Sequence, residues 1–237
     1  MKVALVCIAK NEDNYIEEWI SYHLKLGFDH IFIYENNWSC NLKNEFITKI
    51  PFNGSTKQLQ AYNNFIQKYS DEYQWAAFFD VDEFLILKKN KNIKDFISNY
   101  DEYNGIGINW CLFGSNGLDK INGNYNVISR FTKREEKINV HIKTILKLNK
   151  NVVMMVHNPN IPIVDPNKNK IVGPFNSNGD YEIAQLNHYF TKSKEEFELK
   201  VSRGRADSPI NRSFDEFFNH DKNDIEDLNA YNFMYND

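Results

Sequence analysis

Three carboxylates stand together in the run Asp80-Val81-Asp82-Glu83, directly after the apolar residues 75–79. Two carboxylates at positions i and i+2 at a strand end can share a hard divalent cation, whose other ligands are diphosphate oxygens and water. Such a cation stabilises the negative charge that develops on a leaving diphosphate. An ordinary solvated turn also produces motifs of this length. The secondary structure predicted around the motif is therefore needed to choose between a cation site and a solvated turn.

The first hundred residues alternate the patterns of strands and helices. Short apolar runs, typical of strands covered on both faces, lie at residues 3–9, 30–34 and 75–79. Apolar residues recur at helical spacing over 16–24 and 59–69, and Gly27 is placed to end the first helix. This order predicts a parallel sheet with right-handed crossovers, whose ligand crevice lies beyond the carboxyl ends of its strands.

Polar clusters follow all three of these strands, at residues 10–14, 35–37 and 80–83. Because the carboxyl ends of parallel strands meet at one edge of a sheet, these clusters are expected to lie close together. Their coincidence favours a nucleotide site over a solvated turn.

The second half of the chain is less regular. Strands are predicted at residues 105–110, 127–131, 141–148 and 152–156, joined by turns rich in Asn and Gly. Two Ser-x-x-Glu capping boxes, at 193–196 and 213–216, each predict the start of a helix. The acidic tail from Asp221 is expected to be only partly ordered.

Composition limits the class of protein. The formal net charge of -4 over 237 residues argues against a protein that coats nucleic acid. The three cysteines, Cys7, Cys40 and Cys111, lack CxxC spacing, so we expect neither a disulfide framework nor a zinc site, and a reducing cytosol fits. The apolar run after Met1 is too short for a signal peptide, and no window approaches eighteen apolar residues. We therefore expect one cytoplasmic catalytic domain over 1–237.

Several motifs together resemble a known family. They are Lys10-Asn11-Glu12, Glu17-Glu18-Trp19-Ile20 with Tyr22-His23, Gln60-Ala61-Tyr62-Asn63, the run 80–84, and 186–193 with Arg203-Gly204-Arg205-Ala206-Asp207. This set, which spans about residues 3 to 228, is similar to the bacterial glycosyl transferase family 2-like proteins related to glycosyltransferase family 92. The resemblance implies a GT-A fold, an α/β fold with a mixed, mainly parallel central sheet flanked by helices. It divides the domain into a nucleotide-sugar half at 1–104, an acceptor half at 105–192, and C-terminal helices with the tail at 193–237.

The resemblance also implies a donor and a cation. The donor is a nucleotide-diphosphate sugar, usually a uridine one, with Mn²⁺ or Mg²⁺ bound by Asp80 and Asp82. His188 is the expected third metal ligand, and a hydrogen-bonded core histidine is the alternative. The expected donor contacts are Ala9, Lys10, Asn11, Glu12, Glu35, Asn36, Gln60, Asn63, Asp80, Val81, Asp82 and Arg203. The wider fold often has Asp at the end of the second strand, where this chain has Glu35 and Asn36, so the base preference stays open.

The expected acceptor contacts lie beyond residue 104. They are Trp110, Phe113, Gly114, Ser115, His141 and Lys143. Aromatic faces pack on sugar rings and Gly allows close approach of the backbone, although core packing explains the aromatic residues equally well. His141 and His157 are weaker cases, which are better explained as structural histidines. Excess Lys and Arg between 120 and 150 predict a patch for diphosphate, an anionic glycan or an anionic membrane, or else a solvated face.

Transfer with inversion, which the resemblance favours, needs a base for the acceptor hydroxyl. Asp165 is the expected base, with Asp207 and Glu83 as alternatives. The predicted function is metal-dependent sugar transfer to a glycan or glycolipid acceptor in capsule or lipopolysaccharide synthesis, with peripheral contact at the inner membrane face. A nucleotidyltransferase or phosphotransferase is one alternative, although its usual glycine-rich loop is missing at residues 10–12. A non-catalytic sugar-binding module is the other.

Overall fold

The computed structural model describes residues 1–206 and 208–236. Its strands are β1 (Val3–Ala9), β2 (His30–Glu35), β3 (Ile47–Pro51), β4 (Trp75–Phe78), β5 (Glu83–Leu87), β6 (Gly105–Leu112), β7 (Lys133–Arg134), β8 (Ile142–Lys147), β9 (Ile163–Val164), β10 (Lys170–Ile171), β11 (Ala184–His188) and β12 (Ile225–Glu226). Its helices are α1 (Ile16–Lys25), α2 (Gln58–Tyr69), α3 (Ile93–Ile97), the 3₁₀ turn η1 (Ser98–Tyr100), α4 (Val127–Arg130), α5 (Lys194–Arg203), α6 (Asp215–His220) and α7 (Asn229–Tyr235).

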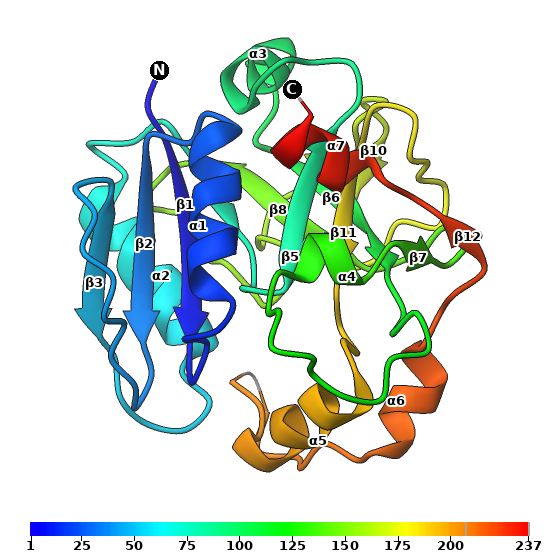
Figure 1. Cartoon of the computed structure of the whole chain (residues 1–237). Helices are drawn as coiled ribbons and strands as arrows, with labels where there is room; N and C mark the ends of the chain where they lie inside the picture. Colours follow the sequence, from blue (N-terminus) through cyan, green and yellow to red (C-terminus); the bar gives the residue numbers. More distant parts are fainter. Residues whose placement is uncertain (207, 237) are drawn as a thin grey trace.

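One mixed sheet runs through the molecule in the order β10-β9-β6-β8-β4-β1-β2-β3 (Figure 1). The strands β4, β1, β2 and β3 are parallel, as the alternation of strands and helices predicts. The second half joins this parallel part through β8, which pairs antiparallel with both β4 and β6. Beside β6, the parallel strand β11 continues to β5. The predicted α/β fold with a mixed, mainly parallel sheet between helices is confirmed.

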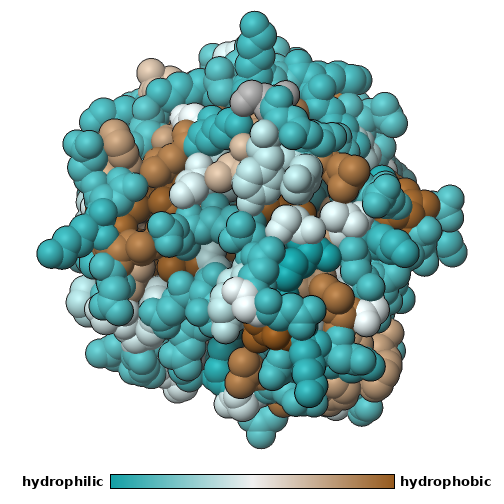
Figure 2. Space-filling view, in the orientation of Figure 1, coloured by the Kyte–Doolittle hydropathy of each residue, from teal (hydrophilic) through white to brown (hydrophobic). Residues whose placement is uncertain are grey.

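Helices cover both faces of the parallel strands because every residue of β1 is apolar and buried. Alternate side chains of a strand point to opposite faces. Val3, Leu5 and Cys7 pack with the apolar face of α1, whereas Ala4 and Val6 pack with that of α2. Both helices therefore bury one stripe each against the same strand. The face in Figure 2 is mainly hydrophilic, with apolar residues in small separate groups.

The sheet brings several strand ends to one edge. β1, β2 and β3 point to the side of the molecule on which α5 and α6 lie (Figure 1). β8 runs the opposite way to β4, so its beginning, next to His141, lies near the end of β4. On the other side His188, the last residue of β11, pairs with Glu83 and Leu112. The chain therefore delivers polar residues from both halves to one edge.

Some local predictions were wrong. Residues 127–131 form the helical turn α4, in which Val127, Ile128 and Phe131 share one buried side. Residues 152–156 form no strand, because both backbone polar groups of Met154 bind the side chain of Asn63. The described part of the tail is ordered: β12 pairs with β7, and α7 packs against α4 and β5.

The capping predictions had mixed outcomes. The capping box of Ser193 and Glu196 is complete and opens α5. At the second box α6 begins only at Asp215, with Phe214 as its N-cap. Gly27 follows the last residues of α1 with φ of +99°, a conformation that favours glycine, as predicted. Within the described ranges, none of the helices combines the length and apolar character that crossing a bilayer requires.

A candidate active site at the carboxyl ends of the strands

A cavity of about 700 Å³ lies at the carboxyl ends of β1, β2 and β4. Its volume is in the range of pockets that hold small molecules and cofactors. The lining also includes the loop at 54–56, strand-end residues of β6 and β11, and the segment that follows α5. Both halves of the chain and the C-terminal helices therefore surround one cavity.

Asp80 is held from behind by buried partners. Its Oδ2 accepts a hydrogen bond of 2.8 Å from Lys143 Nζ, and its Oδ1 accepts one of 2.9 Å from Gln58 Nε2. The side chain of Lys143 is 0% exposed, whereas that of Asp80 is 32% exposed toward the cavity. The backbone N–H of Asp80 donates to Glu83 Oε2, which lies 3.7 Å from Lys143 Nζ. Asp80 is thereby fixed in one orientation.

The charges behind Asp80 compensate one another. Burial alone would lower the pKa of Lys143, but the carboxylates of Asp80 and Glu83 raise it well above its ordinary value. Burial raises the pKa of Glu83 well above its ordinary value, although Lys143 opposes this. Lys143 therefore remains a cation, and its positive charge stabilises the carboxylate of Asp80.

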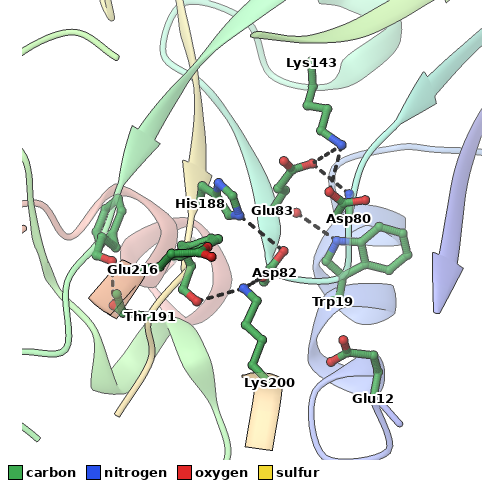
Figure 3. A network of polar contacts seen from close by, with 12 residues as sticks. Glu12, Trp19, Asp80, Asp82, Glu83, Lys143, His188, Thr191, Lys200 and Glu216 are labelled. Carbon is green, nitrogen blue, oxygen red and sulfur yellow. Dashed lines mark hydrogen bonds and ion pairs between the residues drawn. The ribbon is translucent and has the colours of Figure 1, made fainter. Parts of the chain in front are cut away.

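Asp82 has different partners, drawn in Figure 3. Its Oδ2 accepts a hydrogen bond of 2.6 Å from Lys200 Nζ, and its Oδ1 lies 3.6 Å from His188 Nε2. Burial alone would raise the pKa of Asp82, but Lys200 and His188 hold it well below the usual range. Lys200 also donates to the Phe190 carbonyl. Burial lowers the pKa of His188 to about 4, so its imidazole is neutral at pH 7.

Donor chemistry tests whether a divalent cation fits here. Two ligands that each lie about 2.1 Å from one ion are separated by at most about 4.2 Å, and the 3.6 Å between Asp82 Oδ1 and His188 Nε2 satisfies this. An ionised carboxylate and a neutral imidazole are suitable ligands. Asp80 fits less well, because Lys143 and Gln58 take its oxygens. Within the described residues, no group of three or more ligating side chains is gathered. The residues fit a cation held by Asp82 and His188 and completed by a ligand.

A loop next to β2 forms one wall of the cavity. Asn36 Nδ2 donates to the carbonyl oxygens of Phe52 and Gly54, which fixes the start of the loop. Thr56 in this loop has φ of +50°, which is rare for a β-branched residue. Backbone strain of this kind concentrates at functional sites. The loop and the end of β1 therefore form a rigid pocket where open α/β sheets bind ligands.

Cationic side chains of the segment 200–212 form another wall. Arg205 and Arg212 both bind Glu216 of α6, and Arg203 forms an ion pair with Glu12. Three guanidinium groups thus face two glutamates, in addition to Lys200 at Asp82. Guanidinium groups match the geometry of phosphate oxygens. This wall has spare positive charge for a diphosphate.

A neutral aromatic wall surrounds Trp110. Its ring centroid lies 4.3 Å from that of His188, 5.0 Å from that of His141 and 5.1 Å from that of His157. Burial lowers the pKa of His157 to about 4 and also lowers that of His141. Trp110 Nε1 is buried and has no hydrogen-bond partner among the described residues. A wall of uncharged rings suits packing against a sugar.

The structure brings many of the predicted site residues together on the cavity. They are Ala9, Lys10, Glu12, Asn36, Asp80, Val81, Asp82, Trp110, His141, His188 and Arg203, with Lys143 directly behind Asp80. Asn11 is exposed and does not line the cavity. The roles expected for the lining residues stay predictions.

Several expected donor contacts serve the fold instead. Glu35 accepts the backbone N–H of Cys40 and is buried outside the cavity. Gln60 is exposed and binds Lys57, while Asn63 holds Met154. Glu35, Gln60 and Asn63 are therefore not placed for the donor contacts that were predicted for them. The helix α2 turns Gln58, not Gln60, toward Asp80.

The turn after Trp110 is also structural. Phe113 is a core residue. Ser115 does not line the cavity, and its backbone N–H donates to Asp221. A Cβ at Gly114 would come within 2.3 Å of the Lys222 carbonyl oxygen, so glycine is required there by the C-terminal segment. These residues anchor the tail.

The predicted base does not reach the cavity. Asp165 is fully buried after β9 and accepts hydrogen bonds from the Asn169 backbone and from the side chains of Asn169 and Asn176. Glu83 is also fully buried, behind Asp80. Neither position suits a base that touches a substrate. Asp207 lies outside the described residues.

Several cations of the basic patch expected at 120–150 are paired. Arg130 binds Glu196, Arg134 binds Asp227, and Lys143 is the buried partner of Asp80. These three cations are therefore not part of a free cationic surface, whereas Lys120, Lys133 and Lys137 of the same patch are exposed.

Some cavity residues were missed. Gln58, Lys200, Arg212 and Glu216 line the cavity. Gln58 precedes Tyr62 by four residues and so shares its helix face, and Lys200 is four residues from Glu196 in α5. These spacings were visible in the sequence. The contacts of Gln58 with Asp80 and of Lys200 with Asp82 join residues that lie more than twenty positions apart in the sequence, so a local pattern does not reveal them.

The chain is similar to several known proteins. The family model described as glycosyltransferase family 92 matches residues 53–231. A family 92 protein of Ricinus communis is 24% identical over 218 residues, covering 85% of this chain and 38% of that protein. One of Oryza sativa is 27% identical over 129 residues, covering 49% of this chain and 22% of that protein. The chain thus spans well under half the length of these curated relatives. The S. aureus TarS 1-349 structure has a TM-score of 0.35 and 16% identity, covering 62% of this chain and 47% of that one.

The mixed, mainly parallel sheet and the cavity of acidic and cationic residues at its carboxyl edge define an α/β protein with a candidate ligand site. The chain belongs to glycosyltransferase family 92. The bacterial affiliation expected from the resemblance stays a prediction, since these two relatives are plant proteins.

Proposed function

We propose that the chain transfers a sugar from a nucleoside diphosphate donor, a UDP-sugar, to a hydroxyl group of a glycan with inversion at the anomeric carbon. The observation that carries the proposal is the contact of Asp82 with Lys200 and His188 on a cavity that also bears Arg203, Arg205 and Arg212. Negative and positive groups alternate there, as recognition of a diphosphate together with a cation requires.

Each wall of the cavity has one part in the proposal. The loop at 54–56 and Asn36 hold the nucleoside, and Lys200 and Arg203 hold the diphosphate by charge and hydrogen bonds. When bound by Asp82 and His188, a divalent cation supplies positive charge that stabilises the leaving diphosphate. Lys143 and Gln58 keep Asp80 in one orientation at the edge of this site.

The acceptor occupies the wall around Trp110. Its neutral rings support a sugar acceptor rather than an anionic one. A glycan or glycolipid of capsule or lipopolysaccharide synthesis, met at the inner membrane face by a cytoplasmic enzyme, is the acceptor we propose from the family resemblance.

Ligand-dependent melting tests the donor proposal. The chain should gain thermal stability with UDP-sugars in the presence of Mn²⁺ or Mg²⁺, because a ligand that binds only the folded state raises Tm. Asp82→Ala should abolish this gain, while Asp119→Ala, a matched change at an exposed carboxylate, should keep it. A chain that no nucleotide sugar stabilises would contradict the proposal. Sugar binding that survives Asp82→Ala without turnover would indicate a binding module instead.

A further inference from the structure

A single displacement at the anomeric carbon needs a group that takes the proton of the attacking hydroxyl. Among the described residues, each carboxylate that lines the cavity is ion-paired. The pairs are Glu12 with Arg203, Asp80 with Lys143, Asp82 with Lys200, and Glu216 with Arg205 and Arg212. In each pair the carboxylate is already engaged by a cation of the protein. The site therefore needs another proton acceptor.

Imidazoles are the other proton acceptors on the cavity. His188 faces Asp82, and His220 lies on α6 with its ring against Phe190. His141 and His157 contact Trp110, in the wall where the acceptor is proposed to bind. In the described part of the chain, neither of these two is paired with Asp82, and both touch the proposed acceptor wall.

The hydrogen bonds of His141 define its tautomer. Asn139 Oδ1 accepts the backbone N–H of His141 at 3.1 Å, so this atom is the amide oxygen. The same oxygen lies 3.0 Å from His141 Nδ1, which must therefore carry the proton. The lone pair of the neutral ring is then on Nε2, which has no hydrogen-bond partner in the described part of the chain.

Trp110 fixes the ring of His141 relative to the leaving-group site. The two rings are stacked at 26° with centroids 5.0 Å apart, and Trp110 also contacts His188 and His157. Trp110 thus contacts both His141 and His188, and His188 lies next to Asp82 at the proposed leaving-group site. A sugar that packs on Trp110 therefore has His141 in the same wall of the cavity.

We propose that His141 is the general base of the transfer and that Asn139 is its positioning residue. This inference rests on the proposed function. The acceptor O–H bond breaks as its proton moves to His141 Nε2, and the oxygen forms a bond to the anomeric carbon. The bond from that carbon to the β-phosphate oxygen breaks, and its electron pair leaves with the nucleoside diphosphate. His141 then releases the proton to solvent.

His157 is the weaker of the two candidates. Its Nδ1 donates to the Ile142 carbonyl, so it has the same tautomer. Burial lowers its pKa to about 4, however, and so weak a base contributes less to proton transfer near neutral pH. The titratable groups around His141 are His157, with ring centroids 5.9 Å apart, and His220, whose charge lowers the pKa of His141.

Hydrolysis of UDP-glucose, UDP-galactose and UDP-N-acetylglucosamine by the full chain tests the base, with water in place of the acceptor. His141→Gln should slow release of UDP by on the order of 100-fold or more, while UDP binding measured by calorimetry stays within about two-fold. His30→Gln, at a histidine that binds Thr48 far from the cavity, is the matched control. Added imidazole should restore part of the rate to His141→Gly.

The pH dependence of the rate of UDP release distinguishes a general base from a merely structural histidine. Asn139→Asp places a carboxylate beside the Nδ1 proton and should raise the pKa of His141, which moves the acid limb of the rate profile to higher pH. UDP release by His141→Gln at the unaltered rate, or a nitrogen NMR spectrum in which Nε2 carries the proton at neutral pH, would overturn the proposal. Failure of the unaltered chain to bind UDP would instead contradict the proposed function.

Discussion

Asp80 and Asp82 stand two residues apart, yet they have separate environments. The sequence pattern suggested that both share one cation, because i and i+2 side chains leave a strand on the same side. In the structure β4 ends at Phe78, and a buried lysine from β8 takes Asp80 while a lysine from α5 takes Asp82. The residue types predicted a polar site. The tertiary contacts then give Asp80 and Asp82 different partners, and so different roles in it.

Two glutamines of α2, Gln58 and Gln60, allow a matched test of the contact with Asp80. Gln58 donates to Asp80, whereas Gln60 is exposed. A hydrogen bond to a charged group contributes about 1.5 to 3 kcal/mol, so Gln58→Leu should lower UDP-sugar turnover by about ten-fold or more. Gln60→Leu should leave turnover unchanged. Equal turnover in both variants, measured as UDP release, would exclude Gln58 from the site.

Lys143 is the residue whose loss should cost the most stability. Its ammonium is the buried partner of Asp80 and lies close to Glu83. Lys143→Met leaves these carboxylates without compensation, and breaking a buried pair in this way costs about 3 to 5 kcal/mol in the free energy of unfolding. Urea unfolding followed by circular dichroism measures this change. Lys147→Met, an exposed lysine on the same strand, is the control, and a similar loss there would show that the effect is unspecific.

At the scale of elements, α5 is the helix that carries cations to the cavity. Its first turn is fixed twice: by the capping box of Ser193 and Glu196, and by the two hydrogen bonds from Arg130 to Glu196. The side chains of Arg130 and Glu196 are almost fully buried. Lys200 and Arg203 follow one and two turns later on this anchored helix. The stability of the N-terminus of α5 and the position of the cations are therefore linked.

Ser193→Ala tests this link. Loss of an N-cap side chain costs about 1 kcal/mol in the free energy of unfolding, and fraying of α5 should also weaken UDP binding. Ser202→Ala, at an exposed serine near the other end of the helix, should change neither quantity. A loss of stability with unaltered UDP affinity would show that the cations do not depend on the cap.

The predictable elements are those with a strong local pattern. β1, α1 and α5 follow from an apolar run, a helical period and a capping box, which need no knowledge of the rest of the chain. β5 was missed because its strand begins within the acidic motif at Glu83 and pairs with β11 about a hundred residues later. Asp165 was misplaced for the same reason: its burial depends on asparagines of neighbouring loops. Local pattern predicted the edge of the sheet, and distant contacts decided which residues reach the cavity.

At the scale of the whole molecule, the donor and acceptor halves share one sheet. The halves are joined by two antiparallel pairings, β5 with β11 and β4 with β8, and at the second of these, the seam, Ala77 lies opposite Ile145. The cavity lies across this seam, with Asp80 on one side and His141 on the other. The tail also crosses it, since α7 packs against β5 and α4. These shared contacts favour one catalytic domain, which stays a prediction.

Native-state hydrogen exchange tests that prediction. If the halves unfold together, the slowest amides of β1 and β4 should exchange with the same opening free energy as those of β6 and β8, because buried strands of one cooperative unit open only on global unfolding. Breaking the seam would leave both β4 and β8 with an unpaired edge and would expose the apolar residues Ala77 and Ile145, which are fully buried. That cost makes separate opening of either half unfavourable. Distinct opening free energies for β1 and β6, with different denaturant dependence, would show two units joined at β4 and β8.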